Sequence, residues 1–154
     1  DEEVRGYMQK LSETGTYTVS DRVLRAVQAE FSCGFCTDAQ GAQTIGKTFR
    51  ENHYLLDTHT AVACTVLDAY RSGTGDQTLT VVESTASPFK FCASVLDALG
   101  VTEHAPGTGV LGQLTAETGR PAPTPLASLA GKPVRFDQVT DRGDMRAVVT
   151  EFLR

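Results

Sequence analysis

The stretch VVESTASPFKF, residues 81–91, changes character in its middle and decides how the rest of the chain is interpreted. The β-branched residues 78–82, bounded by turn residues, predict the clearest strand of the sequence. Pro88 suits the first position of a helix, and Ser87 suits its N-cap. A strand that enters a helix through a short polar turn is a βα unit. In open α/β sheets, ligands bind at such turns.

Helical patterns surround this unit. Apolar residues recur at intervals of three and four, and capping residues mark three helix starts: Ser20, Thr37 with Gln40 at capping-box spacing, and Asp57. Residues 134–136 could form a further strand. The predicted fold class is therefore α/β and helix-rich, a small sheet of few strands surrounded by helices. The expected helices cover residues 4–14, 21–31, 37–49, 58–70, 88–99, 110–114 and 144–153.

Length and composition predict a single soluble domain, residues 1–154. The chain is 40% hydrophobic, enough for one compact core at this length, and no apolar run approaches the roughly 20 residues that cross a bilayer. A net charge of −5, spread along the chain, argues against nucleic acid as a partner. The cysteines number four, too few for a disulfide scaffold, so we expect a reducing compartment and the cytoplasm. The chain begins without Met and enters a helical pattern at once, so we also expect it to be part of something longer.

Cys33 and Cys36 form a C-x-x-C pair with two possible chemistries. A thioredoxin-like redox site should follow a strand, whereas a predicted helix precedes this pair. A zinc site would need two more ligands at comparable spacing, but Cys64 and Cys92 are single residues on apolar helix faces. A structural role is favoured for Cys33 and Cys36, and a thiol redox protein is kept as an alternative. No metal site is predicted.

Asp57 and His59 could pair, with the carboxylate orienting the imidazole, but Asp57 is also a natural helix cap, and capping is favoured. Lys90 lies between two phenylalanines and could pass for a desolvated nucleophile, although it is expected to point outward. The helix start near Ser87 could instead hold an anion such as phosphate. A stand-alone anion-binding module is therefore a second alternative function.

Two motifs carry a resemblance to a known family. YLLDTHTAVA at residues 54–63, followed by VVESTASPFKF, resembles the C-terminal third of threonine synthase, a pyridoxal 5′-phosphate enzyme of fold type II. The lead-in GTYTVSD at residues 15–21 fits the same order. The resemblance is strongest over residues 1–100. It is looser over residues 101–154, a helical tail with a Pro-rich stretch at residues 120–125.

The resemblance implies a function for the parent enzyme and a role for one residue. Threonine synthase converts O-phospho-L-homoserine and water to L-threonine and phosphate. In the family, the threonine of the T-A-x-P-x-K-F segment faces the pyridine nitrogen of the cofactor, and here that position is Thr85. Ser84, Asp57 and His59 are expected to lie next to the site. Many members have histidine where this chain has Ser87.

The resemblance also implies what this chain does not supply. The family's Schiff-base lysine and phosphate-binding loop lie upstream of the matching region, and none of the four lysines here has that context. No residue of this chain is therefore assigned a catalytic role, and the chain alone is predicted to be inactive. Its expected partner is the missing N-terminal part of the enzyme, which should dock on an exposed apolar patch. The sequence does not indicate an oligomeric state.

Overall fold

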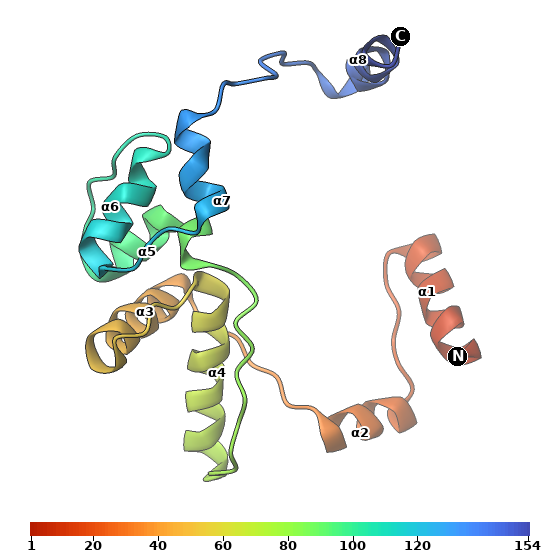
Figure 1. Cartoon of the computed structure of the whole chain (residues 1–154). Coiled ribbons are helices and arrows are strands. Elements are labelled where there is room, and N and C mark those ends of the chain that lie inside the picture. Colours follow the sequence, from red (N-terminus) through yellow and green to blue (C-terminus); the bar gives the residue numbers. More distant parts are fainter.

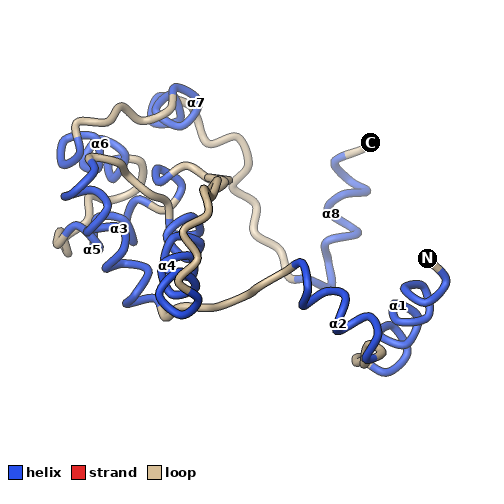
Figure 2. Tube along the Cα trace, turned by 90° about the horizontal axis from the view of Figure 1, so that it is seen from below, coloured by secondary structure: helices blue, strands red, loops and turns tan.

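The structure is built from helices and short helical turns. No residue is paired as a β-strand (Figure 2). The computed structural model describes residues 1–154. The elements are α1 (Glu2–Thr14), α2 (Asp21–Glu30), α3 (Asp38–Asn52), α4 (Thr58–Thr74), the 3₁₀ turn η1 (Pro88–Lys90), α5 (Cys92–Leu99), α6 (Gly109–Thr118), α7 (Thr124–Ala127), the 3₁₀ turns η2 (Ser128–Gly131) and η3 (Arg142–Asp144), and α8 (Met145–Phe152).

The buried core lies where α3, α4, α5 and α6 meet (Figure 1). Helix α3 packs against both α4 and α5, and α5 packs against α6. The core side chains come from all four helices and from the segments that precede α4 and α5. They are Ile45, Leu56, Ala61, Phe89, Cys92, Val95, Leu96 and Leu114.

A glycine lets α3 and α5 approach closely. A Cβ atom built on Gly46 would lie 2.6 Å from the backbone oxygen of Ala98, closer than any side chain tolerates. The atom in its way belongs to the backbone of α5, so it cannot move aside as a flexible side chain could. Helices α3 and α5 can therefore lie this close together only because residue 46 has no side chain.

The terminal helices lie outside this cluster. Figures 1 and 2 both show α1, α2 and α8 lying away from the cluster of α3–α7. Helices α1 and α2 are linked to each other, because the Tyr7 and Tyr17 rings stack 5.4 Å apart and Arg22 pairs with Glu3. The Phe152 ring of α8 meets the Phe136 ring edge-on, at 6.1 Å.

The Pro-rich stretch at residues 120–125 ties the tail to the core. Arg120 Nη2 donates to the backbone oxygen of His53 at 2.7 Å, just where α3 ends with a left-handed residue, φ 54°. Ala122 and Leu126 then pack against the core cluster. The stretch thus stabilises the turn between α3 and α4, a role that the sequence did not reveal.

The predicted helix starts are confirmed. The Ser20 hydroxyl accepts from the Val23 N–H, and Thr37 forms the expected capping box with Gln40. The Asp57 carboxylate caps α4. Each cap is satisfied within three residues, so it could be identified from spacing alone.

The predicted sheet is absent. Residues 78–82 and 134–136 have no strand partner, so the small sheet of the predicted α/β fold is not confirmed, while the helix-rich character is. Residues 79–86 make no backbone–backbone hydrogen bond, and Leu79 and Val81 are 93% and 86% exposed. A β-branched run becomes a strand when another strand pairs with it, and none is present here.

Three other expectations were wrong in detail. The predicted inward face of α4, from Val62 to Tyr70, is largely exposed, and the helix instead buries Thr60 and Ala61. The expected helix over residues 88–99 is split at Phe91 into η1 and α5. Likewise, the three residues of α8 that were expected to point inward are not buried: Val148, Val149 and Phe152. The helical periodicity of these segments is correct, but periodicity alone does not identify which face of a helix meets a neighbour.

No helix of the chain has the length and apolar character needed to span a membrane.

Gly46→Ala tests the close approach of α3 and α5. We expect it to lower the free energy of unfolding by about 1–3 kcal/mol, because the added methyl group forces the two backbones apart. Gly112→Ala in α6 is the matched control, since a Cβ there meets nothing within 4 Å and alanine favours a helix by about 0.5–1 kcal/mol. Urea unfolding of the chain measures both. Equal effects of the two substitutions would contradict the role of Gly46.

Candidate functional site

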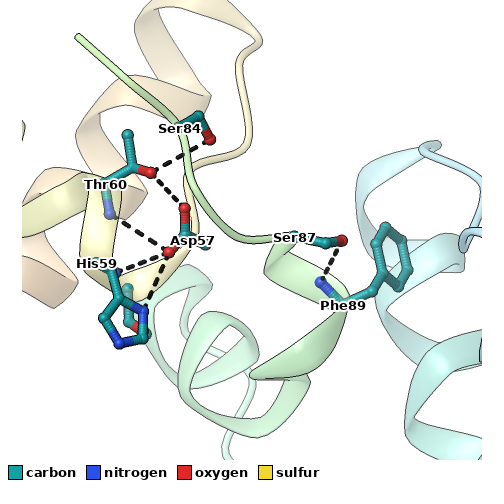
Figure 3. Close-up of polar contacts among 7 residues, drawn as sticks. Asp57, His59, Thr60, Ser84, Ser87 and Phe89 are labelled. Atoms are coloured by element: carbon teal, nitrogen blue, oxygen red, sulfur yellow. Dashed lines mark hydrogen bonds and ion pairs between the residues drawn. The ribbon is translucent and has the colours of Figure 1, made fainter.

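A buried carboxylate organises the start of α4. Asp57 is fully buried, and its Oδ1 accepts hydrogen bonds from the backbone N–H groups of His59 at 2.8 Å and Thr60 at 3.3 Å (Figure 3). Its Oδ2 accepts from the Thr60 hydroxyl. Asp57 therefore caps the helix with one oxygen and holds a side chain of the same helix with the other.

These contacts decide the protonation of Asp57. Burial alone raises the pKa of the carboxyl group, since it disfavours the charged form. The hydroxyl of Thr60, the N–H groups of His59 and Thr60, and the His59 side chain all stabilise the anion. Their combined effect outweighs burial and lowers the pKa of Asp57 below its ordinary value. The position at a helix N-terminus favours the same charge.

The network reaches across to the extended segment before η1. Thr60 Oγ1 lies 3.2 Å from Ser84 Oγ, and this contact joins α4 to a residue 24 positions later in the sequence (Figure 3). Ser84 is followed directly by Thr85, which is exposed. The structure thus brings three of the predicted neighbours, Asp57, His59 and Ser84, to the end of the extended segment that carries Thr85.

His59 lies at the edge of this network. Its Nδ1 is 3.3 Å from Asp57 Oδ1, and its ring packs against Phe91 with 5.0 Å between centroids. The imidazole is nevertheless 64% exposed. Both expected geometries are therefore present at once, because Asp57 caps the helix and also touches the imidazole.

A second anchor holds the beginning of the extended segment. Arg71 Nη2, near the end of α4, donates to the backbone oxygen of Thr78 at 3.1 Å and to Thr80 Oγ1 at 3.2 Å. The Asp76 carboxylate accepts from the Thr78 N–H at 2.8 Å and from its hydroxyl at 2.6 Å. Polar side chains therefore hold residues 78–84 along α4, where backbone pairing would hold a strand in a sheet.

The geometry near Ser87 does not favour the anion-binding alternative. Pro88 has no N–H group, the Phe89 N–H donates to Ser87 Oγ at 3.3 Å, and the Lys90 N–H donates to the Ser87 carbonyl at 3.0 Å. The turn η1 also has only three residues. Its first N–H groups are already engaged, so this turn presents no free set of donors to a phosphate.

The remaining sequence candidates are dispersed. Cys33 and Cys36 lie in the irregular segment between α2 and α3, so a helix and not a strand precedes them. Burial raises the pKa of the Cys64 and Cys92 thiols, which keeps both protonated and unreactive. Lys90 is exposed, as expected, and has none of the desolvation that a lysine nucleophile needs.

Thr60 lies in the motif at residues 54–63 that carries the resemblance, but sequence reasoning gave it no separate role. Its position could have indicated this role, because a hydroxyl three residues after a helix cap can hydrogen-bond to the carboxylate of the cap. Its second contact, to Ser84, depends on how the extended segment crosses α4, and no local pattern encodes that crossing.

These features define the chain as a helix-rich segment. Its extended residues 78–86 are unpaired, and the network of Asp57, Thr60 and Ser84 lies next to the exposed Thr85. Residues 60–150 match the family model described as threonine synthase, C-terminal. The match covers more than half of the chain. The chain therefore belongs to the threonine synthase family, as its C-terminal region, and the resemblance noted in the sequence is confirmed.

Relatives and a solved structure agree with this membership. Threonine synthase of Schizosaccharomyces pombe is 33% identical over 94 residues, which are 60% of this chain and 18% of that protein. The Saccharomyces cerevisiae enzyme is 27% identical over 101 residues, 62% of this chain and 20% of that protein. Human threonine synthase-like 1 is 27% identical over 94 residues, 61% of this chain and 12% of that protein. The chain thus spans at most about a fifth of these relatives.

Among solved structures, the chain is similar to a PLP-bound threonine synthase from Brucella melitensis. The TM-score is 0.53 and the sequence identity 31%, and the likeness covers 77% of this chain and 24% of that one. The helical arrangement is thus shared with about a quarter of a larger enzyme chain.

Asp57→Asn tests the capping network and its pH dependence. At neutral pH we expect a loss of about 1–3 kcal/mol in the free energy of unfolding, because the amide cannot accept at both positions. The lowered pKa means that the carboxylate stabilises the fold above its unfolded pKa, about 3.9, and that this contribution disappears as the pH falls through the folded pKa.

Urea unfolding at a series of pH values measures this effect. The difference between the original chain and Asp57→Asn should be full at pH 7 and shrink below about pH 4. The control is Asp68→Asn, an exposed position in the middle of the same helix, which should change stability little at any pH. A difference that stays constant down to pH 2 would rule out the charged cap.

Proposed function

We propose that this chain is the C-terminal segment of a pyridoxal-phosphate-dependent threonine synthase, in which Thr85 provides one wall of the cofactor site. The parent enzyme would convert O-phospho-L-homoserine and water to L-threonine and phosphate. The observation that carries the proposal is the position of Thr85, exposed at the end of an extended segment whose preceding residue is tied to a buried polar network.

The chemistry of the residues present fits one edge of the cofactor. Thr85 offers a neutral hydroxyl, which can donate a hydrogen bond to the pyridine nitrogen without adding charge. The nearby carboxylate of Asp57 is fully buried and already accepts four contacts, so it is not free to protonate the ring. Pyridoxal phosphate itself supplies the electron sink for the reaction, and a neutral partner at its nitrogen tunes that sink.

The other parts of the site would come from the preceding portion of the enzyme. The resemblance assigns the Schiff-base lysine and the phosphate loop to that portion, and the chain spans 24% of the similar threonine synthase structure. The segment alone is thus expected to be inactive, with O-phospho-L-homoserine bound mainly by residues outside it.

The same missing portion would supply a strand partner for residues 78–82. The outward side chains of Leu79 and Val81 are apolar and exposed, and the backbone groups of residues 79–86 are unpaired. An apolar groove beside α4, lined by Phe35, Val66 and Tyr70 among others, adds to this surface. These features support a docked state in which the predicted strand joins a sheet.

Thr85→Val tests the proposed cofactor contact in the full-length enzyme. We expect a shifted absorbance of the bound cofactor and a turnover lowered about 10- to 100-fold, because the ring nitrogen loses its hydrogen-bond donor. Thr85→Ser keeps the hydroxyl and should stay close to the original enzyme. The control is Thr102→Val, an exposed loop position whose hydroxyl makes no hydrogen bond. An unchanged spectrum and rate in Thr85→Val would refute the contact.

Backbone hydrogen exchange tests the proposed sheet. In the isolated chain, the amides of residues 79–83 should exchange rapidly, since none of them donates to another backbone group. In the full-length enzyme, pairing should slow alternate amides by at least about 100-fold. Amides of the core helix α5 serve as the reference and should be protected in both. Equally rapid exchange of residues 79–83 in both proteins would exclude the strand.

A further inference from the structure

A single hydrogen bond attaches the stretch that contains Thr85 to the helices. Residues 81–86 make no backbone hydrogen bond, and their side chains make one, the Ser84–Thr60 contact of 3.2 Å. The neighbouring anchors are Arg71 on Thr78 and Thr80, before the stretch, and the Ser87 cap after it. The one hydrogen bond that fixes the stretch over α4 therefore joins a pair of hydroxyl groups.

The direction of this hydrogen bond follows from the chemistry of its neighbour. The ionised Asp57 can only accept, so the single hydroxyl proton of Thr60 goes to Asp57 Oδ2. Ser84 must then donate to the remaining lone pair of Thr60. The sequence of hydrogen bonds runs from Ser84 through Thr60 to Asp57, and the helix N–H groups of α4 fix the carboxylate.

We infer that Asp57 and Thr60 are positioning residues that aim the Thr85 hydroxyl by holding Ser84. Successive side chains of an extended backbone point to opposite sides, so a Ser84 held against α4 directs Thr85 away from it. A slip of one residue would exchange these two sides and turn Thr85 toward the helix. This inference rests on the proposed contact between Thr85 and the cofactor, and it adds residues that do not touch the cofactor themselves.

Burial gives this arrangement its rigidity. Asp57 and Thr60 are 0% and 4% exposed, so water cannot readily replace either partner of their hydrogen bond. Ser84 is exposed and belongs to a segment without pairing of its own. The buried residues Asp57 and Thr60 thus form the fixed part of the network on α4, and they orient Ser84 on the extended segment.

Thr60→Val and Ser84→Ala in the full-length enzyme test the inference from both sides of the contact. Each removes the hydroxyl pair, but Ser84→Ala leaves the helix cap intact and so keeps the test valid if Thr60→Val folds poorly. Ser94→Ala, an exposed serine on α5, is the matched control for Ser84→Ala, and Thr60→Ser is the conservative control that keeps the hydroxyl.

The resting cofactor spectrum and turnover are then measured in the single variants and in the double variant Ser84→Ala/Thr85→Val. We expect Ser84→Ala and Thr60→Val to shift the cofactor absorbance in the same direction as Thr85→Val and to lower turnover by up to about 100-fold, since a displaced hydroxyl loses its partner. Thr60→Ser and Ser94→Ala should leave both unchanged. The double variant should match Thr85→Val alone, because Ser84 acts through Thr85.

The outcomes separate the two ideas. If Thr85→Val shifts the spectrum but Ser84→Ala does not, or if the double variant shows the sum of the two single effects, the positioning role is overturned and the proposed function stands. If Thr85→Val leaves the spectrum unchanged, the cofactor contact itself is wrong, and the positioning role fails with it.

Discussion

The buried carboxylate of Asp57 is the constraint on which the local structure depends. A charge without water costs several kcal/mol unless hydrogen bonds replace its hydration, and here α4 provides those bonds at its own N-terminus. The carboxylate therefore stays ionised because the helix begins at Thr58, and the helix begins there because the carboxylate caps it. Each condition therefore stabilises the other.

The packing around this point keeps the cap in place. Leu56 is buried in the core immediately before Asp57, and Arg120 holds the end of α3 through the His53 carbonyl. The close approach of α3 and α5 at Gly46 sets the other wall of the same core. The polar network is thus built on helices that pack tightly, and its geometry can be transmitted to a segment that has little structure of its own.

The sequence predicted those features that are satisfied locally. Ser20, Thr37 and Asp57 each find their capping partners within three residues, so spacing was sufficient. The sequence predicted a strand at residues 78–82, but the structure has none there, because pairing needs two segments and no second segment pairs with these residues. The buried face of α4 was misjudged because Thr60 and Ala61 face the core although Val62 and Tyr70 are more apolar. The Thr60–Ser84 contact lay beyond any local rule, since 24 residues separate its partners.

The exposed face of α4 and the unpaired segment have one physical explanation. A Leu79 and a Val81 left in water contribute nothing to the stability of the chain, yet burial of each side chain is worth roughly 1.5–3 kcal/mol. That free energy becomes available only when a partner covers them, so under the proposed docking it would contribute to docking and not to folding of the segment. In the proposed docked state, polar contacts that already hold the extended segment would reduce the conformational entropy lost on docking. On the proposed function, the Asp57 network would thus act before docking as well as after it.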